Sequence, residues 1–213
     1  MRKLNRTRTG CVLIGIAIGL IIAVRVPSSP KKAAAVHLAD EPGHMAPLAA
    51  PVARPVYALS PEGHVLQSTN GAIWQSLEGF SKGRATAVAQ GKGGTLYVGT
   101  ESAGLFRSDD GGQTWMALTD KMSVPMPNLT VTALAVGASD NAIYAAVGYW
   151  LGIQKAHLAP LGVYVSNDGG MTWQKMIGKT PEGPIVTLEV DQNNSNLVYA
   201  RIEGSETVLQ YAL

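Results

Sequence analysis

One eight-residue pattern occurs twice in this sequence and constrains the fold more than any other feature. SDDGGQTW, at Ser108–Trp115, recurs as SNDGGMTW at Ser166–Trp173. Aspartate accepts hydrogen bonds from the backbone N–H groups of a tight turn, and glycine allows the positive φ that such a turn needs. Each copy therefore predicts the turn of a β-hairpin, followed by a strand that a buried tryptophan begins. The residues given this structural role are Ser108, Asp110, Gly112, Thr114, Trp115, Ser166, Asp168, Gly170, Thr172 and Trp173.

Short apolar segments recur at regular distances from this motif. PVYAL, TLYVG and AIYAA, centred on Tyr57, Tyr97 and Tyr144, each precede a copy of the motif. The first of these copies is the shortened STNGAIW, in which Asn70 replaces the aspartate. A fourth segment, LVYAR at Tyr199, has no motif after it, and a further apolar strand precedes three of the four. Short strands divided by Gly-rich turns predict a repeated four-stranded antiparallel sheet.

These residues resemble the Asp-box, or BNR, repeats of β-propellers, over residues 56–213. Sialidases, sortilin-type receptors and the YCF48-like photosystem II assembly and stability factors use such repeats. The combination of an N-terminal apolar segment with small repeats and no disulfide is most similar to the YCF48-like group. The resemblance implies an all-β fold, a partial Asp-box β-propeller of about four blades. It also implies an accessory subunit or assembly factor of a membrane protein complex, with a photosynthetic complex as the first candidate.

Strand counting predicts two complete sheets and two incomplete ones. The complete sheets span Ala85–Leu118 and Val131–Ile177, whereas residues 56–78 lack a first strand and residues 185–213 lack a last one. Closed propellers usually have four to eight blades, so we expect an open arc or a very small ring. An open arc leaves strand edges that proteins normally cover, which favours a partner protein or a homo-oligomer.

The N-terminal quarter divides into three segments ahead of the propeller-like domain at 56–213. Residues 1–9 are basic and predicted to be cytoplasmic, 10–26 are apolar, and 27–55 form a Pro/Ala-rich linker. The uncharged run, Cys11–Val24, has 14 residues, and counting residues 10–26, with Arg25 reaching the headgroups, gives 17 positions, the lower limit for a membrane span. The positive-inside rule places the C-terminal domain outside. We expect a single-pass anchor in the inner (cytoplasmic) membrane with a periplasmic domain. The alternative is a signal peptide cut after Ala35, although that site matches poorly and lies far from the apolar run.

Charge and residue type exclude several functional classes. Residues 33–213 hold 10 basic and 15 acidic residues, so this part lacks the positive surface that nucleic acids require. A sialidase needs an arginine cluster, but past the linker only Arg84, Arg107 and Arg201 are present. Glycosidases need two facing carboxylates, and the glutamates are scattered singly. We expect no catalytic residues, no cofactor and no metal, with a carbohydrate-binding or glycosidase-like (sialidase-related) propeller as the alternative function.

Two long connections are the candidate partner-binding surface. Thr119–Leu129 joins two predicted blades, and Gly148–Leu161 is an insertion within the second of them. Propeller topology places both on the face opposite the motif turns. Exposed apolar clusters usually mark contacts, and Trp and Tyr are favoured anchors. The candidate residues are Met122, Val124, Met126, Tyr149, Trp150, Leu151 and Ile153. The alternative is that these loops pack on each other or on the open arc.

Overall fold

The computed structural model describes residues 54–91, 93–122, 128–137, 141–152 and 157–213. All of them fall within one compact unit, Lys32–Leu213. Regular structure in these ranges is β, apart from one 3-10 turn, η1 (Thr119–Lys121). None of the helical structure described has the length and apolar character to cross a membrane, and the predicted segment 10–26 lies outside these ranges. The predicted all-β class is confirmed.

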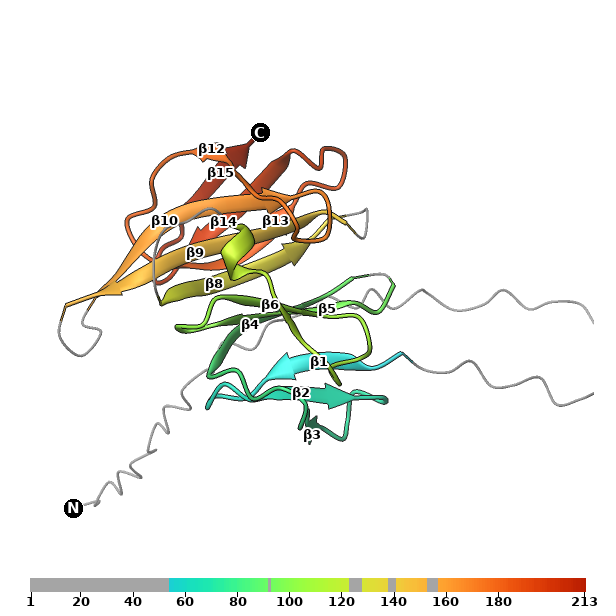
Figure 1. Ribbon diagram of the computed structural model, residues 1–213. Coiled ribbons are helices and arrows are strands. Elements are labelled where there is room, and N and C mark those ends of the chain that lie inside the picture. Colours follow the sequence, from blue (N-terminus) through green and yellow to red (C-terminus); the bar gives the residue numbers. More distant parts are fainter. Residues whose placement is uncertain (1–53, 92, 123–127, 138–140, 153–156) are drawn as a thin grey trace, which may run out of the picture. The chain divides into compact units, whose positions relative to one another are not determined.

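The described strands form four antiparallel sheets, which we number in chain order (Figure 1). Sheet 1 holds β1 (Val56–Leu59), β2 (Val65–Ser68) and β3 (Gln75–Ser76), and sheet 2 holds β4 (Ala85–Gln90), β5 (Leu96–Thr100), β6 (Leu105–Ser108) and β7 (Met116–Ala117). Sheet 3 holds β8 (Leu129–Val136), β9 (Ile143–Leu151), β10 (His157–Ser166) and β11 (Gln174–Lys175). Sheet 4 holds β12 (Ile177–Gly178), β13 (Ile185–Val190), β14 (Leu197–Ile202) and β15 (Val208–Ala212).

The strand order confirms the predicted strands of sheets 1 and 2. It corrects the predicted end of sheet 3 and the predicted number of strands in sheet 4. Sheet 1 has three strands and sheet 2 has four, each in chain order. Sheet 4 is not missing its outer strand, because β12 crosses from the end of sheet 3 and pairs with β15. The register places Ile177 opposite Ala212 and Gly178 opposite Tyr211. Ile177 therefore belongs to sheet 4, and the predicted end of sheet 3 at this residue is wrong. A two-residue strand has too little periodicity to show its partner in the sequence.

Neighbouring sheets stack face to face through their first strands. β1 contacts β4, β4 and β5 contact β8, and β8 and β9 contact β13. Three buried apolar clusters lie between the sheets, one at each junction. Polar contacts join the same sheets, because the Thr86 hydroxyl donates to the Val131 carbonyl at 2.5 Å and the Ala85 N–H donates to the carbonyl of Gly63, in the β1–β2 turn, at 2.9 Å. Four sheets stacked in this way are consistent with a partial propeller.

The recurring tyrosines supply the largest side chains of these clusters. Tyr57, Tyr97 and Tyr144 are 5%, 1% and 1% exposed, and each belongs to the cluster between its own sheet and the next. An aromatic ring buries more apolar area than any aliphatic side chain in the same place. Tyr199 holds the equivalent position in sheet 4 and is half-buried. The difference follows from its place, since the described chain has no further sheet beyond sheet 4.

The two motif tryptophans are half-buried, which corrects the prediction that they are core residues. Their indole N–H groups donate to Gly112 and Gly170 carbonyls within the turns, so the rings stay where solvent reaches them. Trp115 also packs edge-on against Phe80, with ring centroids 4.9 Å apart. The buried residue lies three positions later. Leu118 is fully buried and its counterpart after Trp173, Met176, is 2% exposed.

The predicted long loop at Gly148–Leu161 is mostly strand, which is a second correction. β9 continues to Leu151 and β10 begins at His157, and the two remain paired from Ile143↔Ser166 to Leu151↔His157. A register shift between Pro160 and Gly162 accommodates the extra length. The insertion therefore lengthens a hairpin. The alternation of polar and apolar residues that marks a strand is absent here, because the run GYWLG is apolar on both faces. The sequence therefore did not show that the strands continue.

Replacing Leu118 tests whether sheet stacking depends on the residue three positions after the tryptophan. We expect Leu118→Ala to lower the free energy of unfolding by about 2–5 kcal/mol, because it leaves a cavity between sheets 2 and 3. Met116→Ala, two residues earlier on β7 but 45% exposed, is the matched control and should change it by less than about 0.5 kcal/mol. Urea unfolding of the full chain in mild detergent, followed by tryptophan fluorescence, measures both. Equal effects would contradict the packing described here.

Candidate functional site

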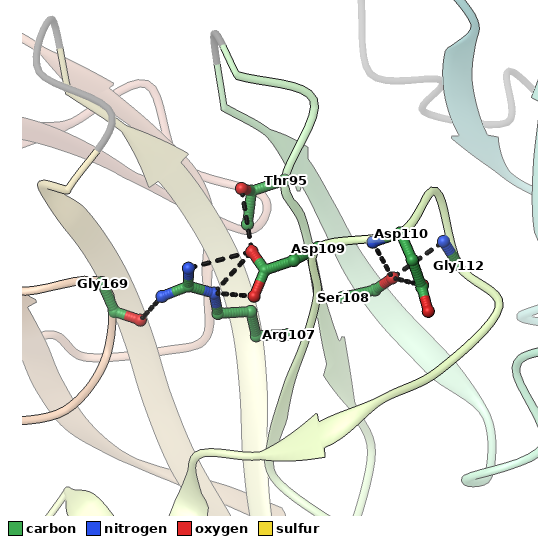
Figure 2. Close-up of polar contacts among 7 residues, drawn as sticks. All are labelled: Thr95, Arg107, Ser108, Asp109, Asp110, Gly112 and Gly169. Atoms are coloured by element: carbon green, nitrogen blue, oxygen red, sulfur yellow. Dashed lines mark hydrogen bonds and ion pairs between the residues drawn. The ribbon is translucent and has the colours of Figure 1, made fainter.

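The turn at Ser108–Trp115 is organised around the carboxylate of Asp110 (Figure 2). Asp110 Oδ1 accepts hydrogen bonds from the Ser108 hydroxyl at 2.7 Å and from the Gln113 and Thr114 N–H groups at 2.9 Å. Its Oδ2 accepts the Thr114 hydroxyl at 2.5 Å. The Ser108 oxygen in turn accepts the Gly112 N–H at 2.8 Å. Ser108, Asp110 and Thr114 therefore satisfy backbone or side-chain groups of the same turn.

The other two turns repeat this arrangement. Asp168 accepts the Ser166 hydroxyl, the Met171 and Thr172 N–H groups and the Thr172 hydroxyl at 2.6–2.9 Å. In the shortened copy, Asn70 Oδ1 accepts the Ala72 and Ile73 N–H groups, both at 2.9 Å. An amide oxygen therefore closes the same kind of turn with one residue fewer. What Asn70 lacks is the second carboxylate oxygen that the threonine hydroxyl binds in the full copies.

These hydrogen bonds hold the two aspartates in the ionised form. The Thr172 hydroxyl and N–H, followed by the Ser166 hydroxyl, lower the pKa of Asp168 to about 2. The same groups from Thr114 and Ser108 lower the pKa of Asp110 well below its usual range. Both carboxylates are solvent-exposed and already saturated with donors inside their own turns. The arrangement suits a fixed structural acceptor and leaves little capacity for proton transfer.

A glycine in each full turn receives a side chain from the preceding sheet. A Cβ on Gly112 would lie 2.5 Å from Leu77 Cδ2, and a Cβ on Gly170 would lie 2.4 Å from Leu118 Cδ1. Leu77 and Leu118 are both buried and each follows a motif tryptophan by three positions. The motif by itself does not predict this contact. The signal that finds it is an apolar residue at the same offset in all three copies: Leu77, Leu118 and Met176.

Arg107 adds a polar link between sheets 2 and 3 (Figure 2). Its Nη1 donates to the Gly169 carbonyl at 2.9 Å, and its Nε donates to both carboxylate oxygens of Asp109 at 2.9 and 3.1 Å. The hydrogen bond with Asp109 raises the pKa of the guanidinium. Thr95 donates to Asp109 Oδ1 at 3.1 Å and helps to position it. One arginine of sheet 2 therefore holds the motif turn of sheet 3.

The structure describes four of the seven candidate partner-binding residues, and one of these four is not on the surface. Met122 is 1% exposed and belongs to the cluster between sheets 2 and 3, so it is a core residue. Val124, Met126 and Ile153 lie outside the described residues. Tyr149 and Trp150 are half-buried on β9 and Leu151 is 43% exposed. The part of the predicted surface that the structure describes is thus the extended end of the β9–β10 hairpin.

Titratable groups in the described ranges do not gather into a metal site. No set of three or more His, Cys, Asp and Glu side chains lies close enough there to hold an ion. Cys11, His37 and His44 lie outside these ranges.

A family model for the BNR/Asp-box repeat matches residues 106–116 and 164–175. The chain contains Asp-box repeats. Both matched segments contain a full motif turn with the geometry described above, and the shortened turn at Ser68–Trp74 lies outside them. The predicted resemblance to Asp-box repeats is confirmed at the two full copies. The four stacked sheets are consistent with an Asp-box propeller family.

Among curated proteins, the chain is similar to an oligoxyloglucan-reducing end-specific xyloglucanase of Emericella nidulans. The two are 28% identical over 110 residues, which is 49% of this chain and 12% of that protein. This chain therefore spans a small part of that relative's length.

Several solved structures resemble the chain at low identity. A GH74 enzyme of Niastella koreensis matches 69% of this chain and 24% of its own, with a TM-score of 0.49 and 20% identity. The GH74 xyloglucanase of Xanthomonas campestris matches 69% of this chain and 33% of its own, with a TM-score of 0.36 and 16% identity. YCF48 from Cyanidioschyzon merolae matches 75% and 66%, with a TM-score of 0.36 and 12% identity.

The lowered pKa of Asp168 predicts a dependence of stability on pH. A carboxylate whose pKa is lower in the folded chain stabilises that chain above the unfolded pKa of about 4, and the stabilisation is lost as pH falls toward 2. We expect the melting temperature of the wild type to fall across this window. Asp168→Asn, which copies the chain's own Asn70, should melt lower at pH 6 and show a flatter profile below pH 4. A variant profile parallel to that of the wild type would contradict the assignment.

Alanine substitutions at two Asp-box glycines separate backbone strain from sheet packing. Gly111 and Gly170 both have positive φ, at 73° and 98°, but a Cβ meets nothing within 4 Å at Gly111 and lies 2.4 Å from Leu118 at Gly170. Gly111→Ala should therefore cost only the left-handed strain, about 1–2 kcal/mol. Gly170→Ala should cost more by the displacement of Leu118. Denaturant unfolding of both variants measures the difference, and equal costs would show that Gly170 is not a packing site.

Proposed function

We propose that the chain is a non-catalytic interaction module, held at a membrane by residues 10–26, that serves as an accessory subunit or assembly factor of a membrane protein complex. A photosynthetic complex is the first candidate, by the YCF48-like resemblance. The observation that carries this proposal is the β9–β10 hairpin, which extends beyond its sheet and exposes apolar side chains on an otherwise structural scaffold.

The hairpin is long for its place in the repeat. β9 and β10 have 9 and 10 residues, whereas the equivalent β5 and β6 have 5 and 4. Pairing with β8 ends at Leu129↔Tyr149, so the pairs Trp150↔Leu158 and Leu151↔His157 extend past the sheet. Figure 1 shows this end on the side opposite the β6–β7 and β10–β11 turns. A regular hairpin that projects from a stacked sheet suits docking, because it presents a fixed surface at little entropic cost.

The chemistry of this end favours a protein partner. Leu151 is 43% exposed, and the buried indole nitrogen of the half-buried Trp150 has no hydrogen-bond acceptor within the described part of the chain. Aromatic side chains with one polar group are enriched at interface centres. A partner that covers Leu151 would remove this exposed apolar side chain from water.

The open end of sheet 1 gives a second reason to expect association. Among the described strands none pairs with the outer edge of β1, and Val56, Ile73 and Trp74 are 37%, 66% and 41% exposed on this sheet. Unpaired strand edges and exposed apolar residues are normally covered. The occupant is a partner subunit or a second copy of the chain.

A glycosidase-like activity is the second candidate function, and the partial match to a xyloglucanase favours it. The two candidates separate in a hydrolysis assay on xyloglucan and its oligosaccharides with the purified full chain. Release of reducing ends above a no-protein control would contradict the non-catalytic proposal. We expect none, because the carboxylates of Asp110 and Asp168 are hydrogen-bonded inside their own turns.

Co-purification from mild detergent tests the docking hairpin. We expect Leu151→Glu to abolish recovery of the complex that the wild-type chain retains, because it places a charge at the centre of the contact. Met171→Glu is the matched control, since Met171 is similarly exposed at 46% but lies in the Asp-box turn of sheet 3. It should leave recovery unchanged. Both variants should keep the wild-type melting temperature.

The proposal is wrong if both variants, or neither of them, lose the same partners. Self-association alone, with no other subunit recovered from native membranes, would also contradict the assignment to a membrane complex.

A further inference from the structure

The junction between sheets 1 and 2 differs from the next junction at the position from which an arginine reaches across. Tyr57 is paired with Gln67, as Tyr97 is paired with Arg107, so Gln67 and Arg107 hold equivalent places in β2 and β6. Arg107 reaches the next sheet and donates to the Gly169 carbonyl (Figure 2). The equivalent of Gly169 in the Asp-box of sheet 2 is Gly111. Glutamine is shorter than arginine, and nothing lies within 4 Å of a Cβ placed on Gly111, whereas one on Gly169 would meet Arg107 Nη1 at 2.4 Å.

A cleft occupies the space that an arginine fills at the next junction. Its volume is about 550 Å³, within the range of small-ligand sites. The polar groups that line it are Gln67, Gln75, Ser76, Glu78 and Gln113, together with the backbone at Gly111. Gln113 is held in place, because its Nε2 donates to the Asp110 carbonyl at 3.0 Å. The cleft is therefore formed by two sheets and one Asp-box turn.

We propose that this cleft binds a neutral oligosaccharide. Side-chain amides both donate and accept hydrogen bonds, as sugar hydroxyl groups do, and three glutamines line one cleft here. The lining carries one carboxylate, Glu78, and no lysine or arginine, so it disfavours anionic ligands. A peptide is a poorer fit, because Leu77 is the one apolar side chain of the lining and it is buried beneath the turn. The site lies on sheets 1 and 2, and it does not depend on the docking hairpin of sheet 3.

A variant that copies two residues of the second junction into the first should close this cleft. Gln67→Arg combined with Thr69→Asp copies the pair Arg107 and Asp109, and should place a guanidinium across the cleft toward the Gly111 carbonyl. The measurement is isothermal titration calorimetry on the full chain in detergent, with cellohexaose, xyloglucan heptasaccharide and mannohexaose as probes. We expect the wild type to bind at least one probe and the double variant to bind it at least about tenfold more weakly, with an unchanged or higher melting temperature.

Two further variants keep the test decisive. Gln75→Leu removes one amide from the exposed strand β3 and should also weaken binding without changing the melting temperature. Arg107→Gln opens the second junction, and should lower the melting temperature while leaving affinity for the probe within about twofold.

The proposal is overturned if none of the three neutral probes binds, or if the double variant binds as the wild type does. Preferential binding of a polygalacturonate oligosaccharide or of an extended peptide at this cleft overturns it as well, because each belongs to a different ligand class.

Discussion

Two of the three junctions between sheets share one contact, in which a leucine of one sheet lies against a glycine in the Asp-box turn of the next. Leu77 meets Gly112 and Leu118 meets Gly170 at distances that leave no room for a Cβ. The aspartate network fixes the turn so that this glycine faces the preceding sheet. The motif therefore connects local turn geometry to the packing between sheets, and its carboxylates are committed to that task.

Both ends of the stack expose apolar side chains. Ile73 and Trp74 are 66% and 41% exposed in the β2–β3 turn of sheet 1, and Ile177 and Val208 are 78% and 47% exposed on β12 and β15 of sheet 4. Terminal repeats with polar outer faces end such stacks in a soluble form, and neither end sheet is wholly polar. Association is therefore expected at the end sheets as well as at the β9–β10 hairpin, and the polar cleft between sheets 1 and 2 is a separate binding surface.

The sequence predicted the parts of the fold that repeat. Asp110 and Asp168 stand in eight-residue patterns whose turn chemistry is local, so the hairpins and the four-sheet plan could be derived from them. Contacts between sheets could not, because they join residues 35–52 positions apart, such as Leu77 to Gly112 and Leu118 to Gly170. The crossing of β12 and the burial of Met122 depend on such contacts too. For the same reason, the cleft beside Gln67 could be found only by comparing two junctions in space.

Amide hydrogen exchange in the Leu118→Ala variant measures whether this leucine couples sheet 2 to sheet 3. If the leucine–glycine contact couples the sheets, the Asp-box amides of sheet 3, at residues 166–172, should exchange faster than in the wild type, together with those of sheet 2. The amides of the shortened turn at 68–74 should be unaffected, because Leu118 does not contact that turn. Faster exchange confined to sheet 2 would show that each sheet is stable on its own and would contradict the account.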